Sequence, residues 1–322
     1  MKILLIGSFP PPLGGTTLTL ELLYQALCKS QKHQISIINL VGIRGSGIRL
    51  PLNVIRLTIK LFKQSHQADV VSLHVATTAL PWAGMIMAII CTLLNKPLII
   101  RKFANTDYEK NKLLSFINKT VIKNSTLFLV ETRELLARTL NRGHKHALWF
   151  PTHRNSATIK NEKISKVASR FVFLGQVREY KGINELIAAI KAVSKDLPHI
   201  QLDVYGPLLE SFCEESINSA NVRYRGVIAQ SQVPDVLPCY DALILPTKAQ
   251  TEGYPGAVVE ALSAGIPVIS TTCGAIHELV TDECGLLVTP GNISALAAAI
   301  KRLATQAELY SQLREGASTA AF

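Results

Sequence analysis

The chain lacks several short patterns that identify common classes of enzyme. No G-x-x-x-x-G-K-S/T segment is present, which argues against a P-loop ATPase, and no G-x-S-x-G segment is present, which argues against a hydrolase of that type. His144 and His146 have no third ligand at zinc spacing, so they do not predict a zinc site. The six cysteines form no C-x-x-C pair, and no signal peptide precedes the first strand-like segment. These absences favour a reducing, cytoplasmic compartment.

Acidic residues are scarce in the first half of the chain. Residues 1–150 carry 19 Lys and Arg against 6 Asp and Glu, a net charge of +13, whereas residues 171–322 carry 10 against 16, a net charge of −6. A basic half joined to an acidic half suggests that the first half faces something anionic, such as nucleic acid, a membrane or a phosphorylated acceptor. A solvated basic surface without a partner is the alternative. Aromatic and basic residues do not interleave, which argues against nucleic acid.

Charged residues are absent from Val70 to Asn95, so this stretch needs to be tested as a membrane span. It is longer than the roughly 18 apolar residues that make a spanning candidate. However, it contains His74, Pro81 and Gly84, and it reads better as a strand followed by a helix that starts with proline in its first turn. The next strand follows at once. We therefore expect a helix that is buried or lies against a membrane surface, not one that crosses it.

Apolar segments with strand and helix periodicity alternate along the chain. In the first half, strands are expected at 2–9, 33–40, 68–75, 96–103 and 125–132, and helices at 16–29, 53–66, 81–94, 112–124 and 133–143. The alternation restarts with 171–175, a helix at 183–195, further segments at 199–206, 221–228, 233–240, 242–247, 256–265 and 267–272, and a last helix from Ile293 to Leu303. Strands that alternate with helices predict parallel, doubly wound sheets, here twice.

A polar segment from Thr152 to Ser169 interrupts this alternation and has no sustained apolar stripe. We interpret it as the crossing between two domains. The prediction is an α/β protein with a Rossmann-like domain at 1–151, a linker at 152–169 and a second Rossmann-like domain at 170–322. In such sheets ligands bind at the carboxyl ends of the strands, so the reaction is expected in a cleft between the two domains.

The segment with the most specific pattern runs from Thr251 to Val268. Glu252 and Glu260 are separated by seven residues, and the turn between them contains two glycines before a helix begins near Gly256. A helix N-terminus after a Gly-rich turn presents free N–H groups and the positive end of the helix dipole, which suits a diphosphate. Glu252 can accept hydrogen bonds from sugar hydroxyls, and Glu260 can hold the two ribose hydroxyls. Two unrelated surface glutamates are the alternative.

This segment resembles the signature of the retaining glycosyltransferases of family 4, which have the GT-B fold. The resemblance extends over nearly the whole chain and is strongest from Phe171 to Pro290. The other matching segments are FLGQVREYKGINELIAAI, DALILPT, TCGAIHELV and CGLLVTPGN. It implies that the two parallel sheets face each other across a cleft, that Glu252 contacts the donor sugar and that Glu260 holds the ribose. It also implies that backbone amides from Tyr254 to Ala257 hold the phosphates.

The chain departs from the family pattern at one position. The family has an arginine after the first glycine of the donor domain and a lysine five residues later, both facing the diphosphate. Here the lysine is present as Lys181, but Gln176 stands at the arginine position. Arg178 is a possible substitute, because residues 176 and 178 share a face if residue 177 points the other way. A solvated surface lysine is the alternative for Lys181.

Three places in the first half resemble acceptor-side features of the family. Gly14 and Gly15 follow the first strand as the family's Gly loop does, although a plain turn is equally consistent with them. His74 lies near the end of a buried strand, where the family often has a histidine that lines the acceptor pocket; a core histidine is the alternative. Arg101 and Lys102 end the next strand and could hold an acceptor phosphate, or form a basic rim without function.

These patterns define the predicted sites. The predicted catalytic residues are Glu252, His74 and Lys181; the predicted donor-binding residues are Gly14, Gly15, Arg178, Lys181, Glu252, Gly253, Tyr254, Pro255, Gly256, Ala257 and Glu260; the predicted acceptor-binding residues are His74 and Arg101. No D-x-D pair is present to hold a metal-bound nucleotide sugar, so we expect no metal ion and no other cofactor.

The functional prediction is retaining transfer of a sugar from a nucleotide-sugar donor to a glycan or lipid-linked acceptor, in cell-surface polysaccharide biosynthesis. The basic first half favours an anionic membrane as partner and a peripheral position on the cytoplasmic face of the cell membrane. A nucleotide-sugar epimerase with the same fold and an inactive scaffold that binds a partner transferase remain alternatives. Gln176 favours the scaffold, as does an expected lack of a returning C-terminal helix after Leu313. The sugar, base, acceptor and oligomeric state are left open.

Overall fold

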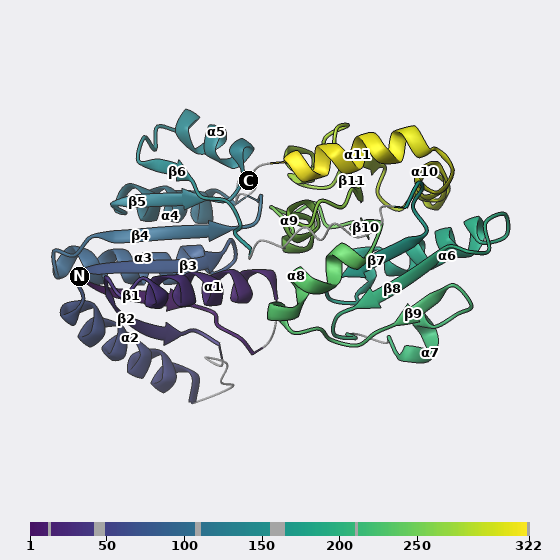
Figure 1. The fold of residues 1–322 in the computed structure, drawn as a ribbon. Helices are drawn as coiled ribbons and strands as arrows, with labels where there is room; N and C mark the ends of the chain where they lie inside the picture. The colour runs from purple at the N-terminus through teal and green to yellow at the C-terminus, as the bar shows by residue number, and fades with distance from the viewer. Residues whose placement is uncertain (12–13, 42–48, 107–110, 155–164, 210–211, 321–322) are drawn as a thin grey trace. The chain divides into compact units, whose positions relative to one another are not determined.

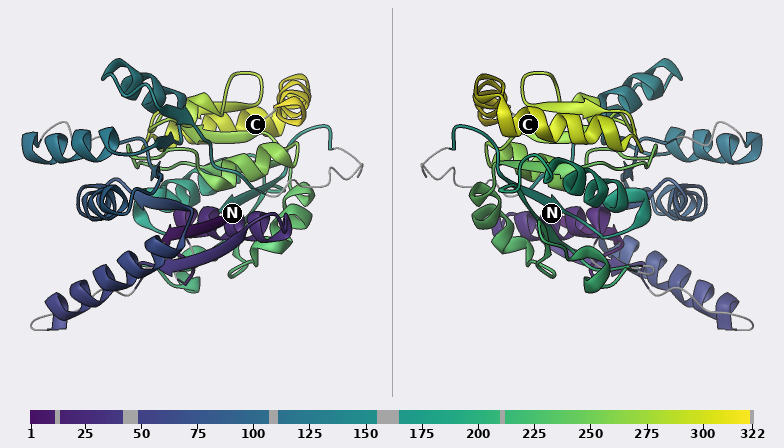
Figure 2. Two further views of the ribbon diagram at one scale, coloured as in Figure 1. Left: turned by 90° about the vertical axis from the view of Figure 1, so that its left-hand side faces the viewer. Right: turned by 90° about the vertical axis from the view of Figure 1, so that its right-hand side faces the viewer.

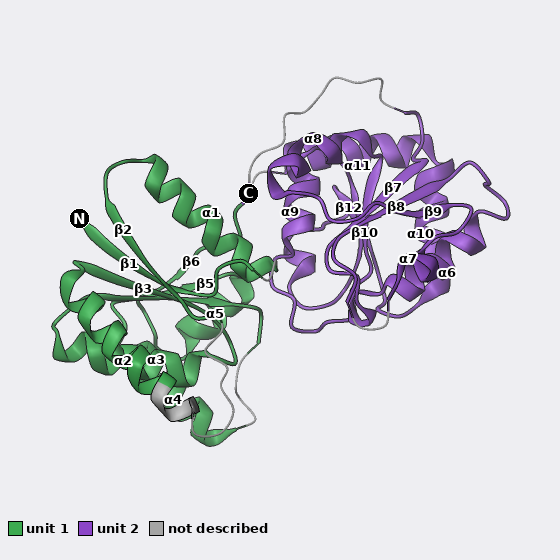
Figure 3. Ribbon diagram, turned by 90° about the horizontal axis from the view of Figure 1, so that it is seen from below, with its two compact units in different colours: residues 1–153 green, residues 154–322 purple. Residues whose placement is uncertain are grey.

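The chain folds into two compact units, residues 1–153 and 154–322 (Figure 3). The computed structural model describes residues 1–322 except 12–13, 42–48, 107–110, 155–164, 210–211 and 321–322. The boundary between the units falls within the segment expected as a linker, 152–169. Most of that segment lies outside the described residues.

The first unit is built on a six-stranded parallel sheet (Figure 1). Its strands are β1 (Lys2–Gly7), β2 (Gln34–Asn39), β3 (Val70–Ala76), β4 (Leu98–Phe103), β5 (Leu127–Val130) and β6 (Ala147–Trp149), in the order β2-β1-β3-β4-β5-β6. Every strand pair is parallel. The alternation of strands and helices therefore predicted the sheet correctly, and only the short β6 was missed.

Helices cover both faces of this sheet. They are α1 (Gly15–Lys29), α2 (Arg49–Gln67), α3 (Leu80–Leu93), α4 (Lys112–Lys123) and α5 (Arg133–Asn141). Figure 3 shows α1 on one face and α2, α3 and α4 on the other. The apolar stretch from residue 70 to 95 is strand β3 followed by α3, as the sequence predicts, and α3 packs into the core between α2 and α4. Among the described residues, no helix is long and apolar enough to cross a membrane.

The second unit contains another six-stranded parallel sheet, flanked by helices. Its strands are β7 (Arg170–Leu174), β8 (Gln201–Tyr205), β9 (Val222–Tyr224), β10 (Ala242–Leu245), β11 (Val268–Thr271) and β12 (Gly285–Val288), in the order β12-β11-β10-β7-β8-β9. Its helices are η1 (Glu179–Lys181), α6 (Ile183–Val193), α7 (Glu214–Ile217), η2 (Gln230–Gln232), α8 (Val233–Val236), η3 (Leu237–Cys239), α9 (Gly256–Ser263), η4 (Ile276–Glu278), α10 (Ile293–Thr305) and α11 (Ala307–Thr319).

Helix α11 follows the last helix that the sequence analysis expected. Its apolar positions Tyr310, Leu313 and Ala317 are buried, and it packs against α9 and α10 of its own unit. The spacing of these three residues, three and then four apart, places them on one face of a helix. The sequence contains this pattern, but α11 was not among the predicted helices.

The strand order places a switch point in each sheet. In the first sheet the chain leaves β1 to one side for β2 and to the other for β3; in the second it leaves β7 for β8 on one side, and β10 lies on the other. Ligands of doubly wound sheets bind where neighbouring strands lead their connections to opposite sides. The loops after β7 and β10, and those after β1 and β3, are therefore the positions at which to look for a site.

Candidate functional site

In the second unit, the loop after β10 carries Glu252 and leads into α9. The backbone of Glu252 is held on two sides: its N–H donates to Ala249 O at 3.2 Å, and its carbonyl accepts from Ala275 N at 3.0 Å. Gly274 packs directly on the Glu252 backbone and has a φ of +54°, so a Cβ at this position would both overlap Glu252 and strain the turn. The loop after β11 thus fixes the backbone from which the Glu252 carboxylate projects.

Lys181 reaches the same place from the loop after β7. It closes the single turn η1, and the following Gly182 adopts a left-handed conformation with a φ of +78° against the carbonyl of Pro246, where a side chain would not fit. The carbonyl of Tyr180 accepts a hydrogen bond from Lys248 N at 2.7 Å. These backbone contacts join the loops after β7 and β10 on either side of the switch point.

The side chains of Lys181 and Glu252 form an ion pair, and both are mostly buried. Thr247 Oγ1 lies 3.2 Å from the same carboxylate oxygen, Oε1. The prediction that Lys181 and Glu252 lie at one site is therefore correct in its geometry, whereas the contact of Thr247 with Glu252 was not predicted. The threonine is the first residue of the polar run that follows β10, which is the signal that could have indicated it.

The residues between β7 and η1 alternate as the sequence analysis supposed. Val177 is fully buried and forms an isolated parallel bridge with Leu208, while Gln176 and Arg178 are half-buried. Because successive side chains of an extended segment point to opposite faces, 176 and 178 share one face. The Arg178 guanidinium lies over the ring of Tyr180, 5.1 Å from its centroid. Arg178 is thus on the side where the arginine of the family pattern is expected.

The N-terminus of α9 begins at Gly256, with Pro255 as the preceding cap residue. The amides of Val258 and Val259 already donate to the Pro255 carbonyl. In the first turn, the amides that suit a phosphate are therefore those of Gly256 and Ala257. Pro255 was among the residues whose amides were assigned to the phosphates, and that detail is wrong because proline has no N–H.

The residues before this helix end are buried. Gly253 and Tyr254 are both covered, and the Tyr254 hydroxyl donates to Glu278 Oε2 at 2.6 Å. Glu278 belongs to η4, in the segment that follows β11. The Tyr254 side chain therefore secures the turn to its neighbour, which leaves its backbone as the part that fits the predicted contact with phosphate.

Glu260 lies one turn into α9, as predicted, and is buried. Its Oε1 is 3.0 Å from Arg154 Nε and accepts a hydrogen bond from Gln230 Nε2 at 2.6 Å. Burial raises the pKa of the Glu260 carboxyl, and Arg154 and Gln230 act in the opposite direction. Neither partner was foreseen. Arg154 is part of the polar segment that was interpreted as a linker, and no local pattern links Gln230 to residue 260.

In the first unit, Gly14 and Gly15 lie at the start of α1, after β1, and His74 lies on the neighbouring strand β3. Gly14 caps α1 in an extended conformation, and its N–H donates to Thr17 Oγ1 at 3.0 Å. Helix α1 begins at Gly15, where a Cβ would meet nothing within 4 Å. The first strand and β3 are paired with Gly7 opposite His74. The glycine pair thus sits at the helix N-terminus that the sequence analysis expected.

His74 is 3% exposed, and its Nε2 lies 2.9 Å from Ser72 Oγ. Burial, and then the positive charges of Arg101 and His153, lower its pKa from 6.5 to about 3. The imidazole is therefore neutral at physiological pH. Whether it contacts an acceptor stays a prediction, but a group with this pKa is a hydrogen-bonding group and not an acid near pH 7.

Arg101 and Lys102 differ in their surroundings although they are adjacent on β4. Arg101 is fully buried, its guanidinium lies over the rings of Phe103 and Phe150, and its Nη2 donates to Pro151 O at 2.9 Å. These contacts fit a structural role, and acceptor binding by Arg101 stays a prediction. Lys102 points the other way, donates to the carbonyls of Ala104 and Thr106, and lines a pocket.

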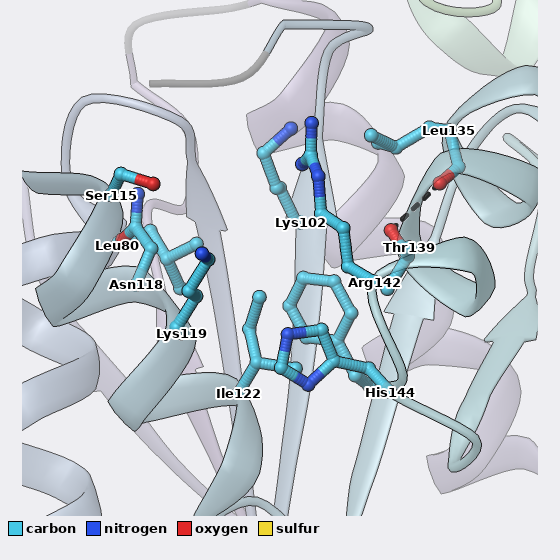
Figure 4. Close-up of a pocket in the computed structure, with 11 residues that line it drawn as sticks. Leu80, Lys102, Ser115, Asn118, Lys119, Ile122, Leu135, Thr139, Arg142 and His144 are labelled. Atoms are coloured by element: carbon cyan, nitrogen blue, oxygen red, sulfur yellow. Dashed lines mark hydrogen bonds between the residues drawn. The ribbon is translucent and has the colours of Figure 1, made fainter. Parts of the chain in front are cut away.

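This pocket lies between α4 and α5 (Figure 4). Its cavity volume is about 40 Å³. Its lining residues in the described part of the chain are Leu80, Lys102, Ser115, Asn118, Lys119, Ile122, Phe128, Leu135, Thr139, Arg142 and His144. Lys119 projects from α4 on one side, and Arg142 and His144 come from the other. Burial lowers the pKa of His144, and the charges of His146, Arg142 and Lys119 lower it further. The surroundings of His144 are therefore electropositive.

Comparison with known proteins identifies relatives of part of the chain. Residues 168–306 match the family model described as glycosyl transferases group 1. TuaC of Bacillus subtilis (strain 168), a protein named for teichuronic acid biosynthesis, is 33% identical over 131 residues, 41% of this chain and 32% of that protein. The capsular polysaccharide biosynthesis glycosyltransferase CapM of Staphylococcus aureus is 28% identical over 172 residues, 51% of this chain and 45% of that protein. The chain thus aligns with less than half the length of these relatives.

The fold of the whole chain is found in solved structures. The crystal structure of Anabaena Alr3699/HepE in complex with UDP superposes with a TM-score of 0.72 at 18% identity, covering 99% of this chain and 95% of that one. At this identity the likeness concerns the fold, which is the GT-B arrangement of two Rossmann-like domains. The chain therefore carries a domain of the glycosyl transferases group 1 family over residues 168–306, within a GT-B fold.

Proposed function

We propose that this protein is a glycosyltransferase that moves a sugar from a nucleotide-sugar donor to a glycan or lipid-linked acceptor, with retention of configuration. The observation that carries the proposal is the convergence at the switch point of the second sheet. There the Lys181–Glu252 ion pair, the N-terminus of α9 and the buried Glu260 carboxylate belong to one pair of neighbouring loops and the helix that follows. Such a set offers groups for a sugar, a diphosphate and a ribose in that order.

Each group has a part in the proposed reaction. The Lys181 ammonium and the amides of Gly256 and Ala257 stabilise the negative charge that develops on the departing nucleoside diphosphate. Glu252, oriented by Thr247 and Lys181, accepts hydrogen bonds from the donor sugar. Glu260 holds the ribose hydroxyls. Retention follows when the acceptor hydroxyl attacks the anomeric carbon from the face that the nucleoside diphosphate leaves. The new C–O bond forms as the bond to the phosphate oxygen breaks, the hydroxyl proton passes to the leaving phosphate, and no covalent enzyme intermediate forms.

The acceptor is proposed to bind in the first unit. The pocket between α4 and α5 combines an apolar floor, including Phe128 and Leu135, with Lys102, Lys119, Arg142 and His144, and no acidic residue is among its described lining. This combination suits an acceptor that has a phosphate next to an apolar group, as a lipid-linked sugar does. Arg101 and Lys102 were both candidates for holding an acceptor phosphate, and Lys102 is the one that lines this pocket.

The outer surface of α2, α3 and α4, which we call the basic apolar face, supports an anionic membrane as partner. These helices contain no Asp or Glu. Neighbouring helices of the face pack on each other, and they lie in a row on one side of the sheet (Figure 2). The exposed large apolar residues of the face are Val54, Ile55, Ile59, Phe62, Trp82, Ile89, Leu93, Leu113 and Phe116. The exposed cations among them are Arg56, Lys60, Lys63, Lys112, Lys119 and Lys123.

Such a surface favours the plane of the lipid headgroups, because apolar burial and attraction to anionic lipid act together. We therefore propose that the protein lies on the cytoplasmic face of the cell membrane, with this face of the first unit toward the lipid. The names of the relatives TuaC and CapM support a role in cell-surface polysaccharide biosynthesis.

A donor screen tests the proposed function. UDP-, GDP- and ADP-sugars are added to the full chain, and thermal unfolding is measured. A ligand at one hundred times its dissociation constant stabilises the folded state by about 2.7 kcal/mol, so the true donor should raise the melting temperature clearly. Transfer to a lipid-linked acceptor is then measured with that donor, and the anomeric configuration of the product is determined by NMR. Absence of binding by every nucleotide sugar, or donor turnover that needs no acceptor, would contradict the proposal.

A further inference from the structure

Arg154 is a buried cation at the N-terminus of α9 that the predicted donor site does not include. Its side chain is 2% exposed, and that of its partner Glu260 is 7% exposed. The guanidinium lies directly against Gly256, the first residue of the helix: a Cβ built on Gly256 would overlap the Arg154 Nη2, Cζ and Nε atoms. Arg154 therefore contacts Glu260 through Nε while its Nη2 end lies at the start of the helix.

The N-terminus of α9 makes this position favourable for an anion. The N-terminus of a helix carries the equivalent of about half a positive charge, which attracts anions and repels cations. The Arg154 guanidinium contacts Glu260 through Nε, and its Nη2 lies against the first residue of the helix. An anion placed at the first amides of α9 would interact favourably with both the dipole and the guanidinium.

The glycine at position 256 is required by this arrangement. Gly256 is a helical residue without a positive φ, so its backbone conformation is open to any amino acid. The Arg154 guanidinium occupies the space that a Cβ on residue 256 would need. The absence of a side chain therefore brings Arg154 as close to the helix end as van der Waals contact allows.

We propose that Arg154 binds the diphosphate of the donor and that Glu260 orients it for this purpose. The inference rests on the proposed function, because it concerns the same nucleotide-sugar site. Glu260 then has two tasks: one carboxylate oxygen holds Arg154 and Gln230, and the other is available to the ribose. Arg154 adds a third cation to Lys181 and Arg178, placed at the helix end instead of in the loop after β7.

The test compares a nucleoside diphosphate with its nucleoside, for which we take UDP and uridine, or the corresponding pair if the donor screen selects another base. Affinities are measured by titration calorimetry or NMR on the full chain. Arg154→Ala should weaken UDP binding about 10- to 100-fold, the range for loss of one charged hydrogen bond, and change uridine binding less than about threefold. Arg154→Lys should recover part of the loss. Arg302→Ala, which removes an exposed arginine of α10, is the control for net charge.

A second variant tests the contact with the helix end. Gly256→Ala should also weaken UDP selectively, because the added methyl displaces the guanidinium. If both changes act through the same contact, the losses in Arg154→Ala and in the double variant Arg154→Ala/Gly256→Ala should be nearly equal. Additive losses would overturn the assignment.

Other results separate this inference from the proposed function. Equal losses for UDP and uridine would mean that Arg154 only supports Glu260, and tighter UDP binding by Arg154→Ala would mean that it blocks the site; either result overturns the inference alone. A wild-type protein that binds none of UDP, GDP and ADP would overturn the inference and the proposed function together.

Discussion

Glu260 shows how the fold can bury a carboxyl group and supply partners that favour its charged form. Desolvation disfavours the carboxylate, while the Arg154 guanidinium and the Gln230 amide favour it. A buried acid with its partners on one oxygen is suited to recognise two adjacent hydroxyls with the other. The residue is therefore expected to contribute to binding of the nucleoside part and not to depend on the identity of the sugar.

Replacing Glu260 with Gln should weaken every nucleotide, whatever its sugar. The amide has the shape of the carboxyl group but loses the charged hydrogen bonds, which are worth about 1.5–3 kcal/mol, so affinity should fall about 10- to 100-fold for the nucleoside. The loss should be larger for the nucleoside diphosphate and the nucleotide sugar, because Glu260 also orients Arg154. Calorimetric titration of the three ligands measures this. An unchanged affinity for the free nucleoside diphosphate would remove the ribose role from Glu260.

His74 should make the first unit less stable in acid. Its pKa is about 3 in the folded protein and 6.5 as its ordinary value, so between these values the unfolded chain binds the proton and the folded chain does not. Stability is then fully present above pH 6.5 and is lost as the pH falls toward 3. At pH 5 the loss amounts to about 2 kcal/mol.

Urea unfolding at pH 7 and pH 5 measures the effect, followed by tryptophan fluorescence. Both tryptophans, Trp82 and Trp149, belong to the first unit, so the signal reports on that unit. The wild type should lose about 2 kcal/mol more than His74→Gln between the two pH values. An imidazole of His74 that titrates above pH 5 in an NMR experiment would contradict the burial argument.

At the scale of single elements, helix α2 concentrates the charges that would contact anionic lipid. Replacing Arg56, Lys60 and Lys63 with Gln should weaken binding to anionic vesicles by about 3 kcal/mol at low salt, since each cation near the surface contributes about 1 kcal/mol. Nucleotide affinity should not change. Co-sedimentation with vesicles measures the binding, which should be weak with neutral lipid and reduced by salt.

The matched control for α2 replaces Lys191, Lys195 and Arg223 with Gln. It removes the same charge from exposed positions of the second unit and should leave vesicle binding nearly unchanged. If the wild type ignores anionic vesicles at low salt, or if the control variant loses as much binding as the α2 variant, the basic apolar face does not bind the membrane through α2. A soluble acceptor would then fit the first unit better.

Helices α4 and α5 provide a separate test of acceptor binding. Arg142→Gln should raise the KM for a phosphate-bearing acceptor about tenfold and leave nucleoside diphosphate affinity unchanged, because it alters only the pocket between these helices. Lys145→Gln is the control, since Lys145 is an exposed lysine of the same loop that does not line the pocket. Equal effects of both changes on KM would point to a general effect of charge on the acceptor.

At the scale of the whole molecule, the proposed mechanism needs no metal ion. The diphosphate would be neutralised by Lys181, Arg178, Arg154 and the amides of α9, so turnover should survive EDTA with less than about a twofold change. The measurement is transfer activity in EDTA against activity with added Mg²⁺ or Mn²⁺. Activity that disappears with the chelator and returns with either ion would contradict this assignment of the neutralising groups.

Much of the fold could be predicted from the sequence because its signals are local. Hydrophobic periodicity located the five longer strands and the five helices among the described residues of the first unit, and the regular alternation predicted that their sheet is parallel. The spacing of Glu252 and Glu260 across a Gly-rich turn, with Lys181 after the first strand of the second unit, located the candidate donor site. These patterns depend on neighbours in the chain, so a single sequence contains them.

What only the tertiary structure decided depends on residues that are distant in the chain. Arg101 and Lys102 are adjacent in a basic pair, yet the pleat of β4 sends one between two phenylalanine rings and the other into a pocket, a difference that the pair alone does not encode. Arg154 reads as one more charge in a polar linker, but the fold buries it against Gly256 and Glu260, about a hundred residues later in the chain. Periodicity reports which side of an element is covered, and only the packing of distant elements decides what covers it.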